Sequence, residues 1–463
     1  MSPSAPSPTP FEKMLAEARQ ALELPTGSEE HLLVRESDSL PSCFAVSDLA
    51  AASVAAAGLA ASELLALEGE PPPVVVDRHL ASAWFLWSLR PQGWKPPGPW
   101  DPIAGDYPTE DGWIRLHTSA QRHREAALAV LGCAGEREPV AAAVARCQAG
   151  ELEAAIAAAG GCAAEMRSVG AWREREQGRA VAAEPLIALR RMPAPAPRPW
   201  RPEPGRPLAG VRVLDLTRIL AGPIATRFLA GLGADVLRID PPGWDEPSVA
   251  PDVTLGKSCA RLDLRRADDR RVFEALLAEA DVLVHGYRPG AMEGLGYDEA
   301  QRRAINPGLV DVSLCAYGWS GPWAERRGFD SLVQMSAGIA EAGMRWKQAD
   351  KPVPLPVQAL DHATGYLMAA AALRGLIARQ REGETIAARL SLARTAALLV
   401  EAGEALAGPA FGGMQEQDYN AEVEDTAWGP AQRLRSPILI GGNPLRWVLP
   451  ASPLGSATAA WRA

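Results

Sequence analysis

Asp361 stands at the head of an apolar, alanine-rich stretch whose composition is typical of a buried helix. The commonest role of an aspartate in this place is that of an N-cap, whose side chain accepts a hydrogen bond from the first helical turn. The helix end also favours the ionised form of a carboxylate, and an ionised carboxylate can attack a thioester carbonyl as a covalent nucleophile. Motif length and spacing alone do not separate these two roles.

Polar and aromatic residues stand next to three expected strands in the second half of the chain. Residues 216–223 (LTRILAGP) join a strand to a helix without the glycines of a dinucleotide-binding turn. Lys257 lies in a loop just ahead of a short strand, 260–264, and Tyr287 and Arg288 follow directly on another strand. Each has an ordinary interpretation as a connection, a solvated lysine or a surface cap. At the carboxyl edge of a parallel sheet, the same groups could bind phosphate.

A regular alternation of apolar strands and helices predicts the elements that position these residues. The expected strands are 211–216, 235–239, 282–285 and 309–314, and the helices between them include 225–232 and 268–280. Strands that are apolar throughout and separated by helices indicate a parallel sheet covered on both faces. The predicted fold class is therefore α/β, with a Rossmann-like doubly wound parallel sheet and a smaller α+β domain.

The first half of the chain is predicted to be mixed α and β. Helices are expected at 40–66, 121–131 and 151–159, and short strands at 73–77 and 112–117. Seven prolines in residues 191–207 exclude a continuous helix or a central strand there and indicate a linker. The predicted division is a flexible N-terminus (1–30), an α/β segment (31–190), a linker (191–206), a Rossmann-like domain (207–345) and a C-terminal part with the Asp361 helix and the following strand (346–463).

A faint internal repeat relates the two halves. Asp48 begins an alanine-rich helix that ends near Glu68, and Asp361 begins another that ends near Glu382, so the separations are 313 and 314 residues. A general bias toward alanine could produce part of this match, so duplication and chance similarity both remain open. Asp48 has no Rossmann-like segment ahead of it and is interpreted as a structural cap.

The composition limits the classes of partner. The 463 residues are 47% apolar and carry a formal net charge of −9, without a basic stripe for nucleic acid. The six histidines and six cysteines have no zinc-like spacing and no CxxC pair, so no metal site is expected. The N-terminus lacks the features of a signal peptide, and polar residues interrupt the apolar windows. We therefore expect a cytoplasmic protein that does not bind a membrane.

Several motifs together resemble the family III CoA-transferases, also called the CaiB/BaiF type, which include formyl-CoA and carnitine CoA-transferases and 2-methylacyl-CoA racemases. The resemblance runs in unbroken order from about Pro207 to Thr395. Its motifs are PLAGVRVLDLT (207–217), AGP (221–223), LGADV (232–236), YRPG (287–290), INP (305–307), YGWSGP (317–322) and GFD (328–330). In this combination the motifs are specific.

The resemblance implies transfer of CoA between an acyl-CoA and a small carboxylic acid. Asp361, in the segment ALDHATG (359–365), would be the nucleophile that forms an aspartyl intermediate. The resemblance also implies a homodimer without a tightly bound cofactor, for which coenzyme A or acyl-CoA is a substrate. The residues it places around CoA are Ile219, Leu220, Lys257 and Tyr287. From its position after the strand, Arg288 could be a phosphate clamp or a surface cap. Arg238 lies close to Pro241, where the family has an arginine, and is included among the candidates.

Two alternatives and a difference in architecture accompany this interpretation. An acyl-CoA racemase or epimerase would need a second proton-transfer group beside Asp361; family racemases have a histidine where this chain has Phe329, and His362 is the histidine near Asp361 in sequence. A catalytically inactive CoA-binding subunit is the other alternative, because the family's glycine-rich loop would correspond to Arg90–Trp100, a stretch of prolines and tryptophans. Segments resembling the family's small domain precede the Rossmann-like part, which implies a permuted or partly duplicated architecture.

Overall fold

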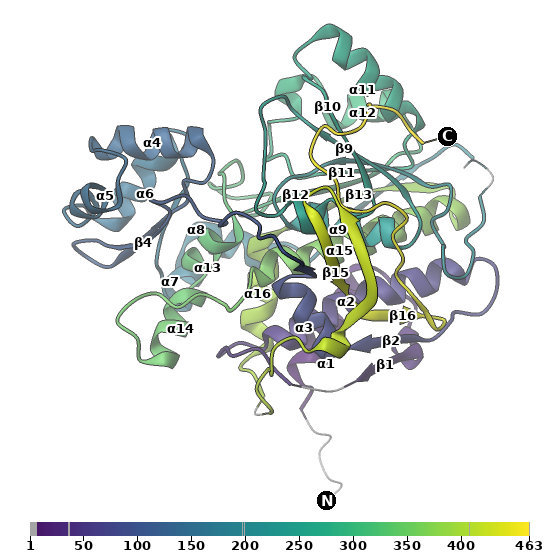
Figure 1. The fold of residues 1–463 in the computed structure, drawn as a ribbon, viewed down its shortest axis with the longest axis horizontal. Helices are drawn as coiled ribbons and strands as arrows, with labels where there is room; N and C mark the ends of the chain where they lie inside the picture. Colours follow the sequence, from purple (N-terminus) through teal and green to yellow (C-terminus); the bar gives the residue numbers. More distant parts are fainter. Residues whose placement is uncertain (1–6, 36–37, 197, 199, 407, 463) are drawn as a thin grey trace, which may run out of the picture.

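The centre of the protein is a seven-stranded sheet with the order β10-β9-β8-β11-β12-β13-β7 (Figure 1). The computed structural model describes residues 7–462 except 36–37, 197, 199 and 407. The strands, in sheet order, are β10 (Lys257–Arg261), β9 (Asp235–Asp240), β8 (Arg212–Leu216), β11 (Val282–His285), β12 (Val310–Cys315), β13 (Glu384–Ser391) and β7 (Ala188–Pro193). The first six are parallel and β7 pairs antiparallel with β13, so the predicted Rossmann-like parallel sheet is confirmed.

The sheet is buried on both faces, as its apolar strands predict. Val213 belongs to one hydrophobic cluster, whereas its neighbour Leu214 belongs to another, because successive side chains of a strand point to opposite faces. Val236 and Leu237 divide between the same two clusters. The helices of this part are α9 (Ala221–Gly231), α10 (Ala250–Val253), α11 (Ala267–Glu279), α12 (Glu299–Ile305), α13 (Asp330–Ser336), α14 (Ile339–Lys347), α15 (Ala359–Arg381) and α16 (Leu392–Ala402), with the 3₁₀ turn η2 (Glu293–Leu295).

The N-terminal part of the chain forms two units. The first consists of α1 (Pro10–Ala21), η1 (Ser28–His31), β1 (Leu32–Arg35), α2 (Val46–Leu65), β2 (Val74–Asp77), α3 (Arg78–Leu86) and β3 (Leu89–Pro91). The second contains β4 (Gly105–Pro108), β5 (Trp113–Leu116), α4 (Gln121–Leu131), α5 (Arg137–Val144), α6 (Ala149–Ala158) and β6 (Ala163–Glu165), and α7 (Val169–Glu174) and α8 (Glu176–Ala183) lead from it to β7. Its antiparallel strands and helices enclose their own core and project from the rest of the molecule (Figure 1). This unit is the predicted smaller α+β domain.

Strands are exchanged between the two halves of the chain. The last elements are η3 (Glu416–Asp418), β14 (Tyr419–Thr426), β15 (Gly429–Leu434), β16 (Ile438–Ile440) and β17 (Asn443–Pro444). In the N-terminal sheet, β2 lies between parallel β1 and antiparallel β16. In the central sheet, β13 lies in the same way between parallel β12 and antiparallel β7. Each half thus supplies an antiparallel strand to the sheet of the other half.

The helices that carry Asp48 and Asp361 occupy matching places in these two arrangements. Asp48 is the third residue of α2 and Asp361 is the third residue of α15. Each helix leads to a strand, β2 or β13, that is followed at once by a helix, α3 or α16. The two helices lie against each other in the core. This agreement of order and pairing supports the duplication explanation of the repeat.

Several predicted boundaries differ from the structure. Residues 1–6 lie outside the described residues, but residues 10–21 form α1 with Met14 buried, so the described part of segment 1–30 is not an open tail. β7 runs into the predicted linker as far as Pro193, which is tolerated because β7 is an edge strand. The central sheet also takes β7 and β13 from outside residues 207–345.

α2 is the one described helix with the length and apolar composition needed to span a membrane. Of its most apolar stretch, 89% is buried inside the molecule.

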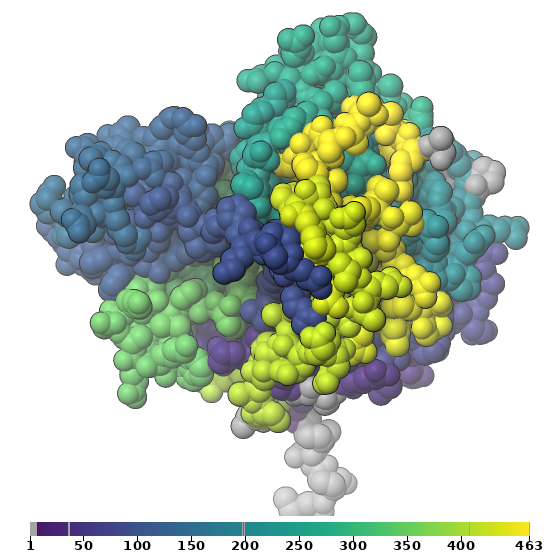
Figure 2. Space-filling model, in the orientation of Figure 1, coloured from purple at the N-terminus to yellow at the C-terminus, as the bar shows by residue number. Residues whose placement is uncertain are grey.

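The C-terminal segment lies across the outside of both halves, where Figure 2 shows it in yellow over the teal surface. The indole Nε1 of Trp447 donates to the carbonyl oxygen of Arg227 at 2.8 Å, and its ring stacks on Trp84 of α3. Near the end of the chain, Arg462 forms an ion pair with Asp235 at 2.6 Å. These contacts join the last turn of α3, the helix α9 and the first residue of β9 in the central sheet.

Separate expression of residues 1–195 and 205–463 should give two products that do not fold, because each loses a strand from its sheet and the apolar partner of α2 or α15. Co-expression should restore an associated, folded pair. Far-UV circular dichroism and size-exclusion chromatography would test this. As the matched control, the full chain cut at a protease site inserted near Glu203 should stay associated; cooperative unfolding of either half alone would contradict the prediction.

Candidate active site

A cavity of about 310 Å³ opens at the carboxyl ends of the parallel strands. Its wall comes from the turn between β8 and α9, the loop after β11, the end of β12, the loop before α13 and the first turn of α15. The small domain closes one side with residues of α4. Ligands of open α/β sheets bind at this edge, because the loops that follow parallel strands meet there.

Asp361 lies in the wall of this cavity and is 8% exposed. The N-cap position of α15 belongs to Gln358, which makes no side-chain cap, so the N-cap interpretation of Asp361 is wrong. The backbone N–H of Asp361 instead donates to Asp330 Oδ2 at 2.9 Å. Asp330 Oδ1 accepts from the amide nitrogen of Gln334 at 2.5 Å, which holds the carboxylate under the start of α15. The carboxyl group of Asp361 does not cap its own helix; it lies in the cavity wall with a backbone hydrogen bond at Ala221.

A close approach between α15 and α9 places the β8–α9 turn beside Asp361. Gly365 follows Asp361 by four residues and so lies on the same face of the helix. A Cβ atom at Gly365 would lie 2.4 Å from the carbonyl oxygen of Ala221, so no larger residue fits without movement of the backbone. Glycine at this position lets the start of α9 reach the nucleophile candidate.

The two neighbouring carboxylates have shifted proton affinities. Burial raises the pKa of Asp361 well above its usual range, the charge of Asp330 adds to this effect, and a backbone hydrogen bond at Ala221 opposes it. Burial also raises the pKa of Asp330 to about 6, against hydrogen bonds from the backbone of Asp361 and the side chain of Gln334. A carboxylate with a raised pKa is more basic, and hence a better nucleophile once it has lost its proton.

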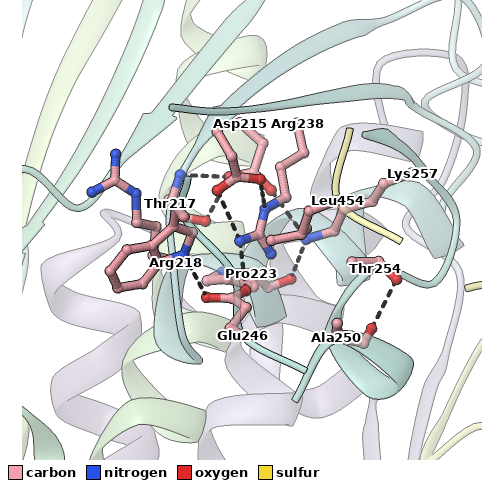
Figure 3. A network of polar contacts seen from close by, with 12 residues as sticks. Asp215, Thr217, Arg218, Pro223, Arg238, Glu246, Ala250, Thr254, Lys257 and Leu454 are labelled. Atoms are coloured by element: carbon pink, nitrogen blue, oxygen red, sulfur yellow. Dashed lines mark hydrogen bonds and ion pairs between the residues drawn. The ribbon is translucent and has the colours of Figure 1, made fainter. Parts of the chain in front are cut away.

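A buried polar network beneath the cavity holds the β8–α9 turn (Figure 3). Asp215 accepts hydrogen bonds from the backbone N–H of Thr217 at 2.8 Å and from Lys257 Nζ at 3.0 Å. Lys257 also donates to the carbonyl oxygen of Pro223 at 2.9 Å, and its side chain has no exposed surface. The predicted loop position and phosphate contact of Lys257 are wrong, because the residue begins β10 and points into the core as the partner of Asp215.

Arg238 belongs to the same network and does not line the cavity either. Its guanidinium binds Asp240 at 2.9 Å and Glu246 at 2.5 Å with no exposed surface, so its predicted place at the CoA site is wrong. The other oxygen of Glu246 accepts from the backbone N–H of Ile219 at 2.8 Å. Ile219 has a φ of 67°, a strained conformation for a β-branched residue, and this hydrogen bond helps to hold it. Lys257 and Arg238 are thus positioning residues for the turn.

The structure brings three of the six predicted CoA-site residues to the cavity wall. These are Ile219, Tyr287 and Arg288. Leu220 instead packs against the main hydrophobic cluster. Arg90–Trp100, the stretch compared with a glycine-rich loop, contributes nothing to the wall, since Arg90 pairs with Gln432 of β15 and Trp94 Nε1 donates to Pro430 at 2.9 Å.

The cavity wall also has residues that the sequence did not predict as site residues, and the basic ones or histidines among them are Arg122, His123, Arg218, Arg326 and Arg327. Arg218 lies inside the turn 216–223, and Arg326 and Arg327 directly precede the GFD motif. Their position in or next to these motifs could have identified them as site residues. Arg122 and His123 come from the small domain, and no feature of the sequence links that segment to Asp361.

The cavity wall carries an excess of positive charge. In the described part of the chain, Arg122, Arg218, Arg288 and Arg327 form no ion pair with a carboxylate, and Asp361 is the acidic residue of the wall. Arg218 lies over the rings of Trp244 and Tyr287, with its guanidinium carbon 5.1 and 5.3 Å from their centres. Unpaired guanidinium groups around a hollow are suited to bind a polyanionic ligand.

The histidines near Asp361 have different surroundings. His362 lies outside the wall and stacks on Phe85 at 4.8 Å between ring centres, and burial and Arg227 lower its pKa to about 3. The proton-transfer role considered for His362 is therefore wrong. His123 does line the cavity, edge-on to Phe329, and burial together with Arg122 and Arg327 lowers its pKa to about 4. His123 is thus neutral near pH 7.

Among the described residues, no group of three or more His, Cys, Asp or Glu side chains is arranged to hold a metal ion. The chemistry of the cavity therefore has to be argued from a buried carboxylate, guanidinium groups and backbone amides.

Comparison with known proteins shows similarity to one family. The sequence profile described as CoA-transferase family III matches residues 208–432. The matched segment contains every element of the cavity wall except the residues of α4, so most of the site lies within it and two residues from outside it, Arg122 and His123, complete the wall.

The family III relatives are similar over part of the chain. An acetyl-coenzyme A transferase of Hypoxylon pulicicidum is 37% identical over 199 residues, which are 40% of this chain and 34% of that protein. A probable fatty acyl-CoA transferase of Mycobacterium tuberculosis is 36% identical over 194 residues, 39% of this chain and 49% of that protein. The crystal structure of the mycobacterial protein matches 42% of this chain and 56% of its own, with 34% identity and a TM-score of 0.39. The matched part of the chain therefore spans 34% and 49% of the length of these two curated relatives.

Replacing Lys257 with Met should destabilise the fold by about 3–5 kcal/mol, because it leaves the buried charge of Asp215 without its partner. The double variant Lys257→Met/Asp215→Asn should lose less stability than the single one. Urea unfolding followed by circular dichroism would measure both. Arg271→Met, which breaks an exposed pair with Asp268, is the control and should change stability by less than about 0.5 kcal/mol; an equally small effect for Lys257→Met would refute the positioning role.

Proposed function

We propose that this protein is a family III CoA-transferase that moves CoA between an acyl-CoA and a carboxylic acid, with Asp361 as the covalent nucleophile. The observation that carries the proposal is the position of the Asp361 carboxylate in the wall of a cavity rich in arginine at the carboxyl edge of the parallel sheet. The names of the relatives, an acetyl-coenzyme A transferase and a probable fatty acyl-CoA transferase, support the same class of reaction.

Coenzyme A would lie along the β8–α9 turn with its phosphates toward Arg218 and Arg288. These side chains, with the ring of Tyr287, stand at the ends of neighbouring strands. Guanidinium groups bind phosphate oxygens in pairs, and an aromatic face offers a surface for the apolar parts of the ligand. The thioester would then reach Asp361 from the cavity, beside the start of α9 that Gly365 allows to pack against α15.

The reaction divides into two exchanges. The Asp361 carboxylate attacks the thioester carbonyl, which forms a mixed anhydride and releases the CoA thiolate. The thiolate then attacks the aspartyl carbonyl of the anhydride, which forms an aspartyl-CoA thioester and releases the first acid. The second acid attacks this thioester, which forms a second mixed anhydride and releases the CoA thiolate. The thiolate then attacks the carbonyl that comes from the second acid, which forms the new acyl-CoA and frees the Asp361 carboxylate. Each step exchanges one acyl bond for another, and the buried position of Asp361 limits loss of the activated bond to water.

The surrounding charges suit these steps. Each attack places negative charge on a carbonyl oxygen, and the arginines of the wall would stabilise that charge. Coenzyme A is a substrate in this scheme and not a resident cofactor. The homodimer and the cytoplasmic location stay predictions.

Asp361→Asn should lower the turnover of CoA transfer by more than about 1,000-fold without loss of fold, because the nucleophile is removed and its volume is kept. In the wild-type protein, incubation with acyl-CoA and hydroxylamine should convert Asp361 to a hydroxamate that peptide mass spectrometry detects. Asp48→Asn is the matched control, since Asp48 has the same place in α2 but forms an ion pair with Arg78 at 3.1 Å, and it should keep activity.

Two outcomes would favour the alternatives. Exchange of the α-hydrogen of an acyl-CoA for deuterium without transfer of CoA would indicate a racemase or epimerase. Tight binding of CoA without exchange across a panel of acids would indicate an inactive CoA-binding subunit. Full turnover by Asp361→Asn would exclude the proposed mechanism.

The rate should fall as the pH falls, because attack requires the ionised form of Asp361 and its pKa is raised by burial and by Asp330. Asp330→Asn removes the neighbouring negative charge but keeps an oxygen that can accept from the Asp361 N–H. The pKa of Asp361 should then be lower, and the acid limb of kcat/KM should move to lower pH. The exposed Asp350→Asn serves as control; an acid limb that stays in place in Asp330→Asn would show that Asp361 does not govern it.

A further inference from the structure

The small domain contributes the beginning of one helix to the cavity wall. α4 starts at Gln121, its N-cap residue Ala120 makes no side-chain cap, and its first turn has no acidic residue. The second and third residues of the helix, Arg122 and His123, line the cavity. Because the start of a helix carries a partial positive charge, an arginine there is unfavourable for the helix itself but favourable for an anion in the cavity.

Arg122 is surrounded by charges that repel it. Burial lowers the pKa of Arg122, and the charges of Arg327, Arg218 and Arg288 lower it further. Arg122 is nevertheless an exposed residue, so it stands where the cavity opens to solvent. Repulsion by three like charges favours conformations in which its long side chain turns away from the cavity into water.

A hydrogen bond to His123 opposes this movement. Arg122 Nε donates to His123 Nε2 at 3.3 Å, which is the one hydrogen bond of this guanidinium group in the described part of the chain. The ring of His123 is 2% exposed and meets the ring of Phe329 edge-on at 5.9 Å between centres, so the acceptor is held in place. The bond uses Nε and leaves the two terminal nitrogens of Arg122 for a ligand.

The bond requires a neutral His123 with its hydrogen on Nδ1. An imidazole nitrogen accepts only when it carries no hydrogen, so the proton of the neutral ring lies on the other nitrogen. His123 Nδ1 is buried and has no hydrogen-bond partner among the described residues. Burial, Arg122 and Arg327 lower the pKa of His123 to about 4. The arginines therefore keep the histidine in the form that can hold one of them.

We propose that His123 is a positioning residue that anchors the guanidinium group of Arg122 at the opening of the cavity, where Arg122 binds a phosphate of coenzyme A. This inference rests on the proposed function for the identity of the ligand, and it adds a contact from outside the matched segment 208–432. Guanidinium nitrogens bind phosphate oxygens in pairs, and a side chain that is already held loses less freedom on binding than a mobile one.

Calorimetry with free coenzyme A tests the proposal, because this ligand carries phosphates and no carboxylate. Arg122→Gln should weaken binding by about tenfold. His123→Leu removes the acceptor and should weaken binding by about fivefold, whereas His123→Gln has an oxygen that can accept from Arg122 and should stay within about twofold of the wild type. In the Arg122→Gln background, His123→Leu should have no further effect.

His117→Leu is the matched control for these variants. His117 is the other buried histidine on Phe329, with 3.7 Å between the stacked rings, but it does not line the cavity. This change should leave the dissociation constant of coenzyme A within about twofold of the wild-type value, since it removes a similar ring contact and no partner of Arg122.

Nitrogen-15 NMR of protein labelled at histidine tests the anchor without a ligand. The ring of His123 should carry its hydrogen on Nδ1 in the wild type, and Arg122→Gln should shift the ring toward the other tautomer because the donor to Nε2 is lost. A hydrogen on Nε2 in the wild type would overturn the anchor.

The binding measurements separate this inference from the proposed function. Equal weakening by His123→Leu and His123→Gln, or additive losses in the double variant, would overturn the inference. A loss confined to the KM of the acceptor acid, with unchanged binding of coenzyme A, would overturn the phosphate contact in favour of a carboxylate. A wild-type protein that binds coenzyme A but transfers no acyl group would contradict the proposed function alone, and the dissociation constants would still decide the inference. A wild-type protein that binds no coenzyme A would contradict both.

Discussion

The packing of two alanine-rich helices in the centre of the molecule is the constraint on which the other features depend. α2 and α15 are buried along most of their length and lie against each other, because alanine side chains allow a close approach. α15 also packs against α9, the helix that begins at the cavity. The head of α15 is thereby held between the N-terminal unit and the central sheet. A carboxylate placed there is deprived of water and surrounded by fixed groups.

That position makes Asp361 chemically unusual. An aspartate at a helix start is ordinarily solvated and capping, but here the cap position precedes it and a second carboxylate holds its backbone. Burial and the charge of Asp330 raise the pKa of the Asp361 carboxyl group, and a backbone hydrogen bond at Ala221 opposes part of this shift. The same cavity wall carries four arginines that form no ion pair with a carboxylate in the described part of the chain. In contrast, Asp48 forms an ion pair with Arg78.

The sequence predicts the central sheet well because its strands are apolar throughout, and that pattern has one stable arrangement, with both faces covered. The sequence also predicts that Asp361, Ile219, Tyr287 and Arg288 lie at the site, and all four line the cavity. Each of them lies next to a strand or helix boundary that can be recognised in the sequence. The predicted positions of Lys257 and Arg238 at the CoA site are wrong, because the sequence does not show whether a basic side chain faces a ligand or pairs with a buried acid. Arg122 and His123 were missed because only the folding of a separate domain brings them to the sheet edge. The exchange of β7 and β16 was invisible because both are short strands far from their partners in sequence.

The exchange of strands has a consequence for biosynthesis. β2 ends at residue 77, yet its neighbour β16 consists of residues 438–440, which leave the ribosome much later. The N-terminal unit must therefore wait, with one strand edge and the apolar surface of α2 uncovered, until residue 440 has been translated. Such exposed edges are prone to pair with other chains, so the nascent protein is a natural client for chaperones that shield them.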